Sequence, residues 1–494
     1  NKIKISAEFT YLNYLAHQSG GLTDQMFYDD IFQSNRHRNW FSVNWLLYNM
    51  QADYSISKKT TLSFNVFYLD AYRYAVGFRS NRVDQIDSFK ERDLIKADFK
   101  NIGCETRLLQ NYTLFNLDMV SLIGGKVYFG KNATAQGPGS SGVDADFSFH
   151  LTDYPNYENQ SEYSNPNINY SFFGENIIYF TDKLSFTPGV RFEFIQTESD
   201  GYYRDVNTDA AGNVILNETI STNDIRKRSF ILYGIGLDYK FTNSYNLYAN
   251  LSQNYRAVTF SDLNIINPSF IINPNIKDEN GFTFDLGLRG RLNNTVLYDV
   301  SSFYLFYNDR IGFVQRALND GSVKNEKGNV GNAEIYGCEM LINFNIDKLL
   351  NLKSFTKSNY YINFSSIQSK YISSNENGVA GNEVEYIPKI NLKTGLELSF
   401  KNYSTTLQYT FLSRQFTDAT NSVNSDLSGV IGEIPSYGVL DFSCMFLLKN
   451  IQLECGVNNI LDRYYFTNRA TGYPGPGIIP SPNRNYYITI QYLF

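Results

Sequence analysis

Histidine and cysteine are scarce in this chain of 494 residues, which holds three histidines and four cysteines. The cysteines are too few for a disulfide-rich scaffold, and no Cys/His spacing typical of a zinc site occurs. Three scattered histidines give little support for a Ser/His/Asp catalytic set. We therefore predict that the protein is not an enzyme and that it has no resident cofactor or metal.

Long apolar runs and an excess of basic residues are missing as well. A membrane-spanning helix needs about 20 consecutive apolar residues, and the sequence has no such run. The formal net charge is −6, whereas a protein that binds nucleic acid needs an excess of Lys and Arg. These absences argue against a helical membrane protein and against a nucleic-acid partner.

Tyrosine and phenylalanine, by contrast, are abundant, at 39 and 38 residues, while the mean hydropathy is −0.33. A chain that is both aromatic and polar is typical of strands on which apolar and polar residues alternate. The last nine residues show this alternation, because one face would carry Tyr486, Ile488, Ile490, Tyr492 and Phe494.

A second segment, residues 184–194, indicates that the polar face of the strands contacts water. Leu184, Phe186, Pro188, Val190, Phe192 and Phe194 share one phase, and the other phase includes Arg191 and Glu193. Charged residues on every second position fit a hydrated lumen better than a dry core. A soluble propeller is the alternative, but blade repeats of constant period are missing.

Short and long connections also alternate along the chain. We expect tight turns near Ser57-Lys58, Thr181-Asp182, Thr242-Asn243, Asn293-Asn294 and Lys449-Asn450, and long polar links at 13–38, 131–165, 200–225, 258–279, 371–386, 417–434 and 463–483. Outer-membrane barrels have short periplasmic turns and long external loops. The prediction is an all-β fold, a transmembrane antiparallel β-barrel with about 18 strands, forming one domain over residues 1–494.

Two cysteines flank the last of these turns. Counting back from Lys449-Asn450 places Cys444 directly opposite Cys455, with both on the apolar phase of their strands. Two readings stay open, a pair of lipid-facing free thiols and a cross-strand disulfide.

Three segments carry a resemblance to a known family. Residues 456–465, read GVNNILDRYY, resemble a penultimate-strand motif of TonB-dependent receptors, and residues 254–260 and 272–279 resemble the two mid-barrel boxes of that family. The resemblance implies a 22-strand barrel with an N-terminal plug, so we expect the plug and about four strands to precede Asn1.

Within this family the external loops resemble those of ferric citrate receptors. Residues 20–36 are similar to their early loop, including Gln33 and Arg36, and residues 415–435 are similar to a late loop and the strand after it. The resemblance implies active transport of a ferric chelate across the outer membrane of a Gram-negative bacterium. The implied partners are the chelate, the TonB complex reached through the plug, outer-membrane lipid and lipopolysaccharide, and an accessory surface lipoprotein.

Two arginines match ligand-contacting positions of that subfamily, namely Arg73 and Arg92. A guanidinium presents a rigid fork to carboxylates, which suits an anionic ferric chelate. The alternative is that each arginine only pairs with a neighbouring acid. The subfamily's further ligand arginine has no counterpart in 131–165, although Arg469 in the final loop could substitute, and Thr259 stands where a ligand Gln is expected. Another siderophore is therefore an alternative ligand.

Two other transport functions compete with this reading. A haem receptor would share the mid-barrel boxes but needs an axial ligand, usually His. The three histidines, His17, His37 and His150, all fall in expected external loops, and none lies between the boxes. A passive porin would fit the strand count, but it would not explain the motif at 456–465.

Overall fold

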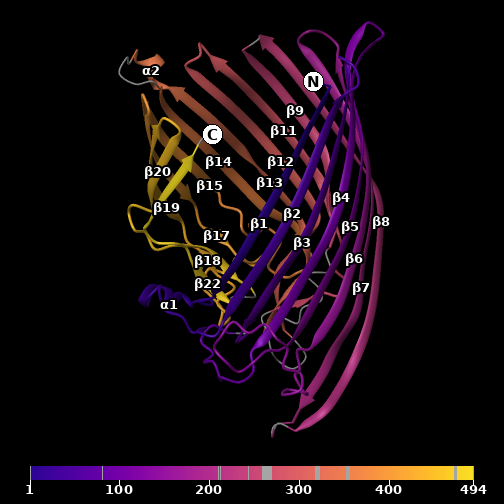
Figure 1. Cartoon of the computed structure of the whole chain (residues 1–494), viewed down its shortest axis with the longest axis vertical. Coiled ribbons are helices and arrows are strands. Elements are labelled where there is room, and N and C mark those ends of the chain that lie inside the picture. Colours follow the sequence, from indigo (N-terminus) through magenta and orange to yellow (C-terminus); the bar gives the residue numbers. More distant parts are fainter. Residues whose placement is uncertain are drawn as a thin grey trace.

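The computed structural model describes residues 2–492 apart from 81, 210, 212, 243, 259–269, 318–322, 352–356 and 472–475. Almost all of the regular structure is strand (Figure 1). The elements are β1 Ile3–His17, α1 Asp24–Asp29, β2 Trp40–Ser55, β3 Thr60–Gly77, β4 Asp93–Leu114, β5 Leu117–Pro138, β6 Ser161–Tyr179, β7 Leu184–Thr208, β8 Val214–Thr242, β9 Tyr245–Arg256, β10 Phe270–Ile272, β11 Glu279–Leu292, β12 Val296–Ala317, β13 Val323–Asn345, α2 Ile346–Leu349, β14 Lys357–Ser374, β15 Ile390–Phe400, β16 Tyr403–Leu412, β17 Gln415–Phe416, β18 Glu433–Ile434, β19 Tyr437–Leu448, β20 Ile451–Asn458, β21 Phe466–Ala470, β22 Gly477–Pro480 and β23 Asn485–Tyr492.

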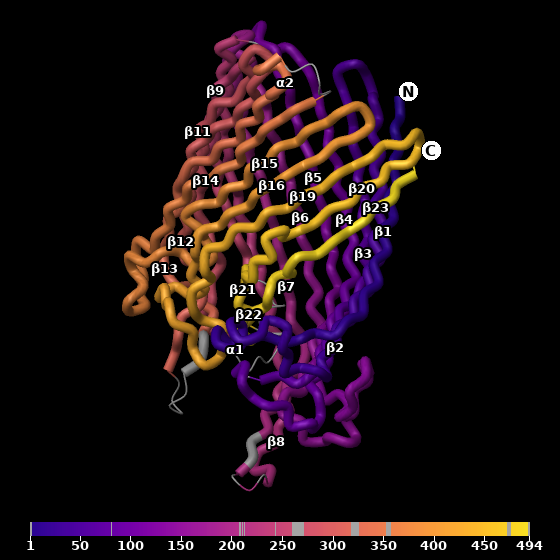
Figure 2. Tube along the Cα trace, turned by 90° about the vertical axis from the view of Figure 1, so that its left-hand side faces the viewer, coloured from indigo at the N-terminus to yellow at the C-terminus, as the bar shows by residue number. Residues whose placement is uncertain are grey.

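One large sheet of 19 strands forms the wall of the molecule within the described residues. Apart from the short β10, which runs parallel to β13, each strand pairs antiparallel with the next main strand along the chain. This gives the eighteen-strand meander that the sequence predicted. The strands wrap around a central space, as the two views show (Figures 1 and 2). The sheet ends at β1 and β23, and no described pairing joins these two strands.

The predicted alternation decides which side chains face outward. Phe192, Ile490 and Tyr492 are 37%, 72% and 56% exposed on the outer face. Phe186 shares the phase of Phe192, whereas Glu193, one residue further along β7, is buried on the inner face. The prediction that every second side chain points outward is therefore confirmed. The terminal Phe494 lies outside the described residues.

The two ends of the sheet differ as expected. Short turns connect the strands at the end where both chain termini lie, and long connections gather at the opposite end (Figure 1). One predicted long link was wrong, because most of 200–225 is strand: β7 runs to Thr208, β8 starts at Val214, and Asp200 pairs with Asn223. This hairpin projects beyond the rest of the wall (Figure 1), and the apolar phase that marks a membrane strand is absent from it.

The clusters of buried apolar residues in the described chain lie at the loop end. One cluster centres on Tyr371, Val379 and Val384, and a second joins Leu22, Phe27, Ile434, Phe466 and Ile478. The wall itself is a single layer. No described helix is long and apolar enough to cross a membrane, a finding that says nothing of a β-barrel.

The cysteine pair lies where the turn count placed it. Cys444 is the register partner of Cys455, and their Sγ atoms lie 2.9 Å apart. The predicted register is confirmed, and the choice between two free thiols and a cross-strand disulfide stays a prediction. Cys104 and Cys338 also lie on outward phases, because Cys104 pairs with Val66 and Val127 while Cys338 is next but one to the exposed Tyr336.

Candidate ligand-binding site

Arg73 lies on the inner face of β3, near its loop end. Its register partners are Val43 on β2 and Ala97 on β4, so no acidic side chain stands directly beside it. The side chain is exposed. Within the described residues it makes no hydrogen bond or ion pair, which leaves all five guanidinium donors available.

A cavity of about 520 Å³ opens on the same inner wall, and its lining, which does not include Arg73, begins on the adjacent strand β4. Phe99, two residues along β4 from Ala97, is part of its lining. The lining also contains two cations, Lys126 and Arg191, and the ring of Tyr128. The other lining residues are Asn132, Thr134, Asn165, Pro166, Asn167, Ile168, Asn169, Ile195, Thr197, Glu198, Ala257 and Val258.

This stretch of wall also holds polar oxygen atoms without partners. The buried Oδ1 atoms of Asn101 and Asn132, with the Oγ atoms of Thr134 and Ser171, have no hydrogen-bond partner in the part of the chain that is described. A buried acceptor left unpaired costs free energy. The wall thus holds buried acceptors that no described donor satisfies.

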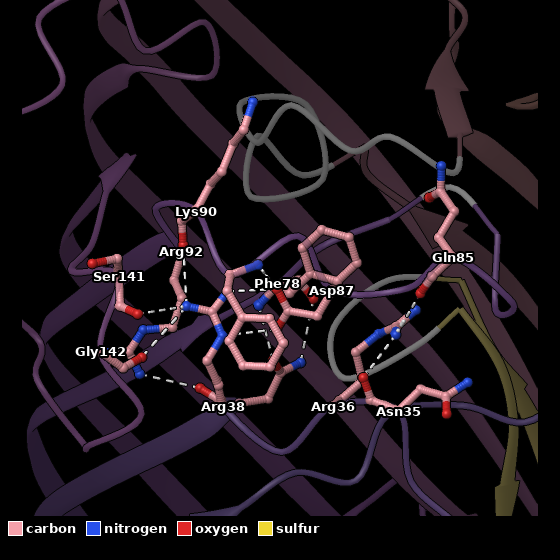
Figure 3. Close-up of polar contacts among 12 residues, drawn as sticks. Asn35, Arg36, Arg38, Phe78, Gln85, Asp87, Lys90, Arg92, Ser141 and Gly142 are labelled. Atoms are coloured by element: carbon pink, nitrogen blue, oxygen red, sulfur yellow. Dashed lines mark hydrogen bonds and ion pairs between the residues drawn. The ribbon is translucent and has the colours of Figure 1, made fainter.

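Arg92, the second predicted ligand residue, is fully buried at the loop end. Its guanidinium donates to the carbonyls of Ser140 at 3.0 Å, Arg38 at 3.1 Å and Asp144 at 2.6 Å. A further bond of 2.6 Å reaches the Ser140 hydroxyl. Its donors are thus used within the protein, where they tie the β5–β6 loop to the β1–β2 loop (Figure 3).

Arg36, which also belongs to the predicted set, is 3% exposed. It donates to the Ser80 hydroxyl at 2.8 Å and to the carbonyls of Gln85 and Val83 at 3.0 and 3.1 Å. Its guanidinium also lies over the Phe78 ring. Burial lowers the pKa of Arg36. The side chain binds the β1–β2 loop to the β3–β4 loop.

Arg38 completes this cluster and was not predicted from the sequence. It forms a two-bond ion pair with Asp87, at 2.8 and 2.5 Å, and donates to the carbonyls of Lys90 and Ser141 (Figure 3). Burial of Asp87 would raise its pKa, but the hydrogen bonds from Arg38 outweigh that effect and the pKa is lowered. The alternation Arg36-His37-Arg38 is the one sequence signal that could have drawn attention to it.

We call Arg36, Arg38 and Arg92 the arginine clamp. Together the three guanidiniums contact the loops 18–39, 78–92 and 139–160, which lie far apart in sequence. Most of their partners are backbone carbonyls, so each loop's fold depends on the other two. The clamp has a structural role in the described structure, next to the mouth of the lumen.

The remaining two predicted residues also contact protein groups. The Gln33 side chain donates to the Met26 carbonyl at 2.7 Å, which closes the turn after α1. Arg469 is 2% exposed and forms a two-bond ion pair with Asp24, at 2.9 and 2.6 Å. It also donates to the carbonyls of Glu433 and Gly429.

The two mid-barrel boxes meet at the base of one loop. Asp278, from the second box, accepts hydrogen bonds from the Tyr255 hydroxyl, the Val258 amide and Arg228. Burial of Asp278 would raise its pKa, yet the bonds from Arg228 and Tyr255 leave it lowered. Hydrogen bonds to Asp278 therefore join the two boxes at the base of the loop. Thr259 lies outside the described residues.

No group of three or more His, Cys, Asp or Glu residues stands close enough to hold a metal ion in the described parts of the chain. His150 is paired instead with Asp153 and Asp146, each at 3.0 Å. His17 lies against the Trp40 ring, with centroids 3.5 Å apart.

Comparison with known proteins identifies the family. Residues 3–460 match the family described as TonB dependent receptor-like, beta-barrel. The chain belongs to this TonB-dependent receptor family. Members of the family are transport receptors, and their barrels lie in the outer membranes of Gram-negative bacteria.

Solved structures of iron-uptake and siderophore receptors have the same fold. The ferric citrate transporter FecA in its unliganded form is 18% identical, with a TM-score of 0.74, over 99% of this chain and 67% of that one. The ferric yersiniabactin uptake receptor FyuA from Yersinia pestis is 13% identical, with a TM-score of 0.73, over 99% and 68%. The siderophore receptor PiuA from Acinetobacter baumannii is 14% identical, with a TM-score of 0.73, over 99% and 72%.

Proposed function

We propose that this TonB-dependent receptor barrel lies in the outer membrane and imports a ferric chelate, with energy from the TonB complex. The observation that carries the proposal is Arg73, an exposed luminal guanidinium with no partner in the described structure, on the strand next to the one where the lining of a cavity of about 520 Å³ begins. Family membership supports uptake, and FecA, FyuA and PiuA are named for ferric citrate, ferric yersiniabactin and siderophore transport.

The predicted site residues then divide into two roles. Arg73 is proposed to contact the chelate directly, because an anionic carboxylate ligand can take up its free donors. Arg36, Arg92 and Arg469 are proposed as positioning residues, because their donors already hold the external loops. Gln33 supports the first of these loops through the turn after α1.

A ferric carboxylate such as ferric citrate fits this wall best. Arg73 and Lys126 supply positive charge, whereas the charge of Arg191 is already paired with Glu193. The plug, the TonB complex, lipopolysaccharide and a surface lipoprotein remain proposed partners.

The test is uptake of radioactive iron, supplied as ferric citrate, by cells that express the full-length protein. The proposal expects uptake that stops when a proton uncoupler collapses the inner-membrane gradient, and that falls at least tenfold in Arg73→Ala. A matched control is Arg107→Ala, because Arg107 is an exposed luminal arginine on β4 that pairs with Glu105. Uptake that persists with the uncoupler, or equal uptake in both variants, would refute the proposal.

A further inference from the structure

A second cavity lies on the opposite face of the wall. Its volume is about 300 Å³, and Tyr409 and Phe411 of β16 form one side. These two residues share the outward phase of Leu407, which is 42% exposed, and they pair with Leu440 and Gly438 on β19. The side of the cavity formed by Tyr409 and Phe411 therefore faces the surroundings of the barrel.

Its height along the strand is set by the length of β16. The strand starts after the short turn at 401–402, and Tyr409 and Phe411 are its seventh and ninth residues. A tilted strand needs about 9–11 residues to cross the hydrocarbon core. The cavity therefore lies where the outer leaflet meets water.

Aromatic rings form most of the remaining lining. Phe27 and Phe466 are buried at its base, with ring centroids 5.2 Å apart, while Tyr28 and Tyr464 stand at its rim, 72% and 56% exposed. Rings at this level are a common feature of barrel proteins. A concave set of rings around a defined volume, however, offers a site for an acyl chain or a sugar ring.

The charge of the cavity lining favours an anionic lipid headgroup. Arg463 is the one charged residue in its described lining. Its side chain is exposed and makes no hydrogen bond or ion pair with any described residue. A second guanidinium lies near the lining residue Leu461, because Arg484 Nε donates to the carbonyl of the preceding residue, Ile460, at 3.0 Å. The cavity thus offers positive charge and no lining carboxylate.

We propose that this cavity is a binding site for a phosphorylated lipid of the outer leaflet. Arg463 binds the headgroup phosphate, and the rings of Tyr409, Phe411 and Tyr464 contact the acyl chains and the headgroup sugar. A guanidinium forms strong paired hydrogen bonds with phosphate. The inference rests on the proposed outer-membrane location, and it assigns lipid contact to one place on the barrel.

Native mass spectrometry of the full-length protein in detergent tests this assignment. The probe is a bis-phosphorylated, acylated glucosamine disaccharide lipid, and the comparison is the same lipid without phosphates. We expect one retained lipid, with occupancy reduced roughly tenfold in Arg463→Gln, the change expected for one lost charge-assisted contact. Tyr464→Ala lowers retention of both lipids, because it removes ring contact and not charge.

Arg414→Gln is the matched control, because Arg414 is an exposed arginine at the same end of β16 that already pairs with Glu433. Equal lipid retention in the wild type, Arg463→Gln and Arg414→Gln overturns the proposal. Retention of inorganic phosphate alone in place of the lipid also overturns it. Failure of the proposed function is seen in different experiments. Absence of the protein from the outer-membrane fraction, or absence of ferric citrate uptake, would refute the proposed function, whereas the lipid-retention measurement tests only the lipid site.

Discussion

Arg469 and Asp24 stand 445 residues apart in the chain and form a two-bond ion pair at the loop end of the barrel, with N–O distances of 2.9 and 2.6 Å. Asp24 begins α1 in the first loop, and Arg469 belongs to β21 in the last loop. Leu22 and Ile478 exchange backbone hydrogen bonds beside this pair. The first and last loops are therefore joined, although β1 and β23 make no described pairing.

Breaking this pair should release the two loops together. In Arg469→Met we expect faster amide exchange at Leu22 and Ile478, whose amides donate to each other's carbonyls. Hydrogen exchange with mass spectrometry checks this. The carbonyls of Glu433 and Gly429 lose the Arg469 donor as well, so Arg469→Met should destabilise the two loops more than Asp24→Asn does. Unchanged amide exchange at Leu22 and Ile478 in both variants would contradict the claim that this ion pair joins the first and last loops.

The same pair gives a dependence on pH. Burial of Asp24 would raise its pKa, but hydrogen bonds from Arg469 outweigh it, so the folded pKa lies below the ordinary value of 3.8. A lowered pKa means that the stabilisation is present above about pH 3.8 and is lost as the pH falls through the folded pKa. Protection of the Leu22 amide should therefore fall in strong acid, and the effect should be absent in Asp24→Asn.

The arginine clamp predicts that three loops lose order together. Arg92→Met removes the guanidinium donor from the carbonyls of Arg38 and Asp144, and it leaves the Ser140 carbonyl with only the Arg92 amide at 3.3 Å. Removal of one member of a buried charged network costs about 3–5 kcal/mol. We expect local exchange to rise by at least a hundredfold in 18–39, 78–92 and 139–160, with the strands unaffected. Exchange confined to 139–160 would show that the loops are independent.

His150 should titrate above an ordinary histidine. Hydrogen bonds to Asp153 and then Asp146 raise its pKa above 6.5. A raised pKa means that the contact stabilises the loop below about pH 6.5 and that this contribution is lost as the pH rises through the folded pKa. Nuclear magnetic resonance of labelled histidine measures the shift. Asp153→Asn should lower the pKa, and an unshifted His150 would contradict the pairing.

The four cysteines test the outward phase directly. All four lie on outward positions in the described strands, so a lipid-soluble maleimide should label them in intact outer membranes, whereas a charged, water-soluble thiol reagent should not. Arg107→Cys supplies a luminal control, because Arg107 is exposed on the inner face of β4 and the charged reagent should label a cysteine there. Labelling of Cys104 and Cys338 by the charged reagent would reverse the assignment of the two faces.

The wall of the barrel was predictable because its signal is local. Alternation over neighbouring residues identified the outward phase of Phe186 and Phe192, and the turn at Lys449-Asn450 fixed the register of Cys444 with Cys455. The β7–β8 hairpin was missed because that signal fades where both faces meet water.

The loop contacts could not be predicted, because they join distant segments. Nothing near Arg38 indicates that Asp87, 49 residues away, is its partner. The resemblance to ferric citrate receptors selected Arg36, Arg92 and Arg469 as ligand residues, but only their contacts show that their donors are already used. Arg73 differs because its neighbours on both adjacent strands are small or apolar, which leaves its charge unmet.

The most direct measurement is equilibrium binding of ferric citrate to the purified full-length protein, with the wild type, Arg73→Ala and Arg107→Ala compared at the same salt concentration. The account predicts that Arg73→Ala weakens binding at least tenfold, about 1.4 kcal/mol or more, and that Arg107→Ala leaves it unchanged. Equal affinity in all three proteins would contradict the claim that Arg73 binds the chelate.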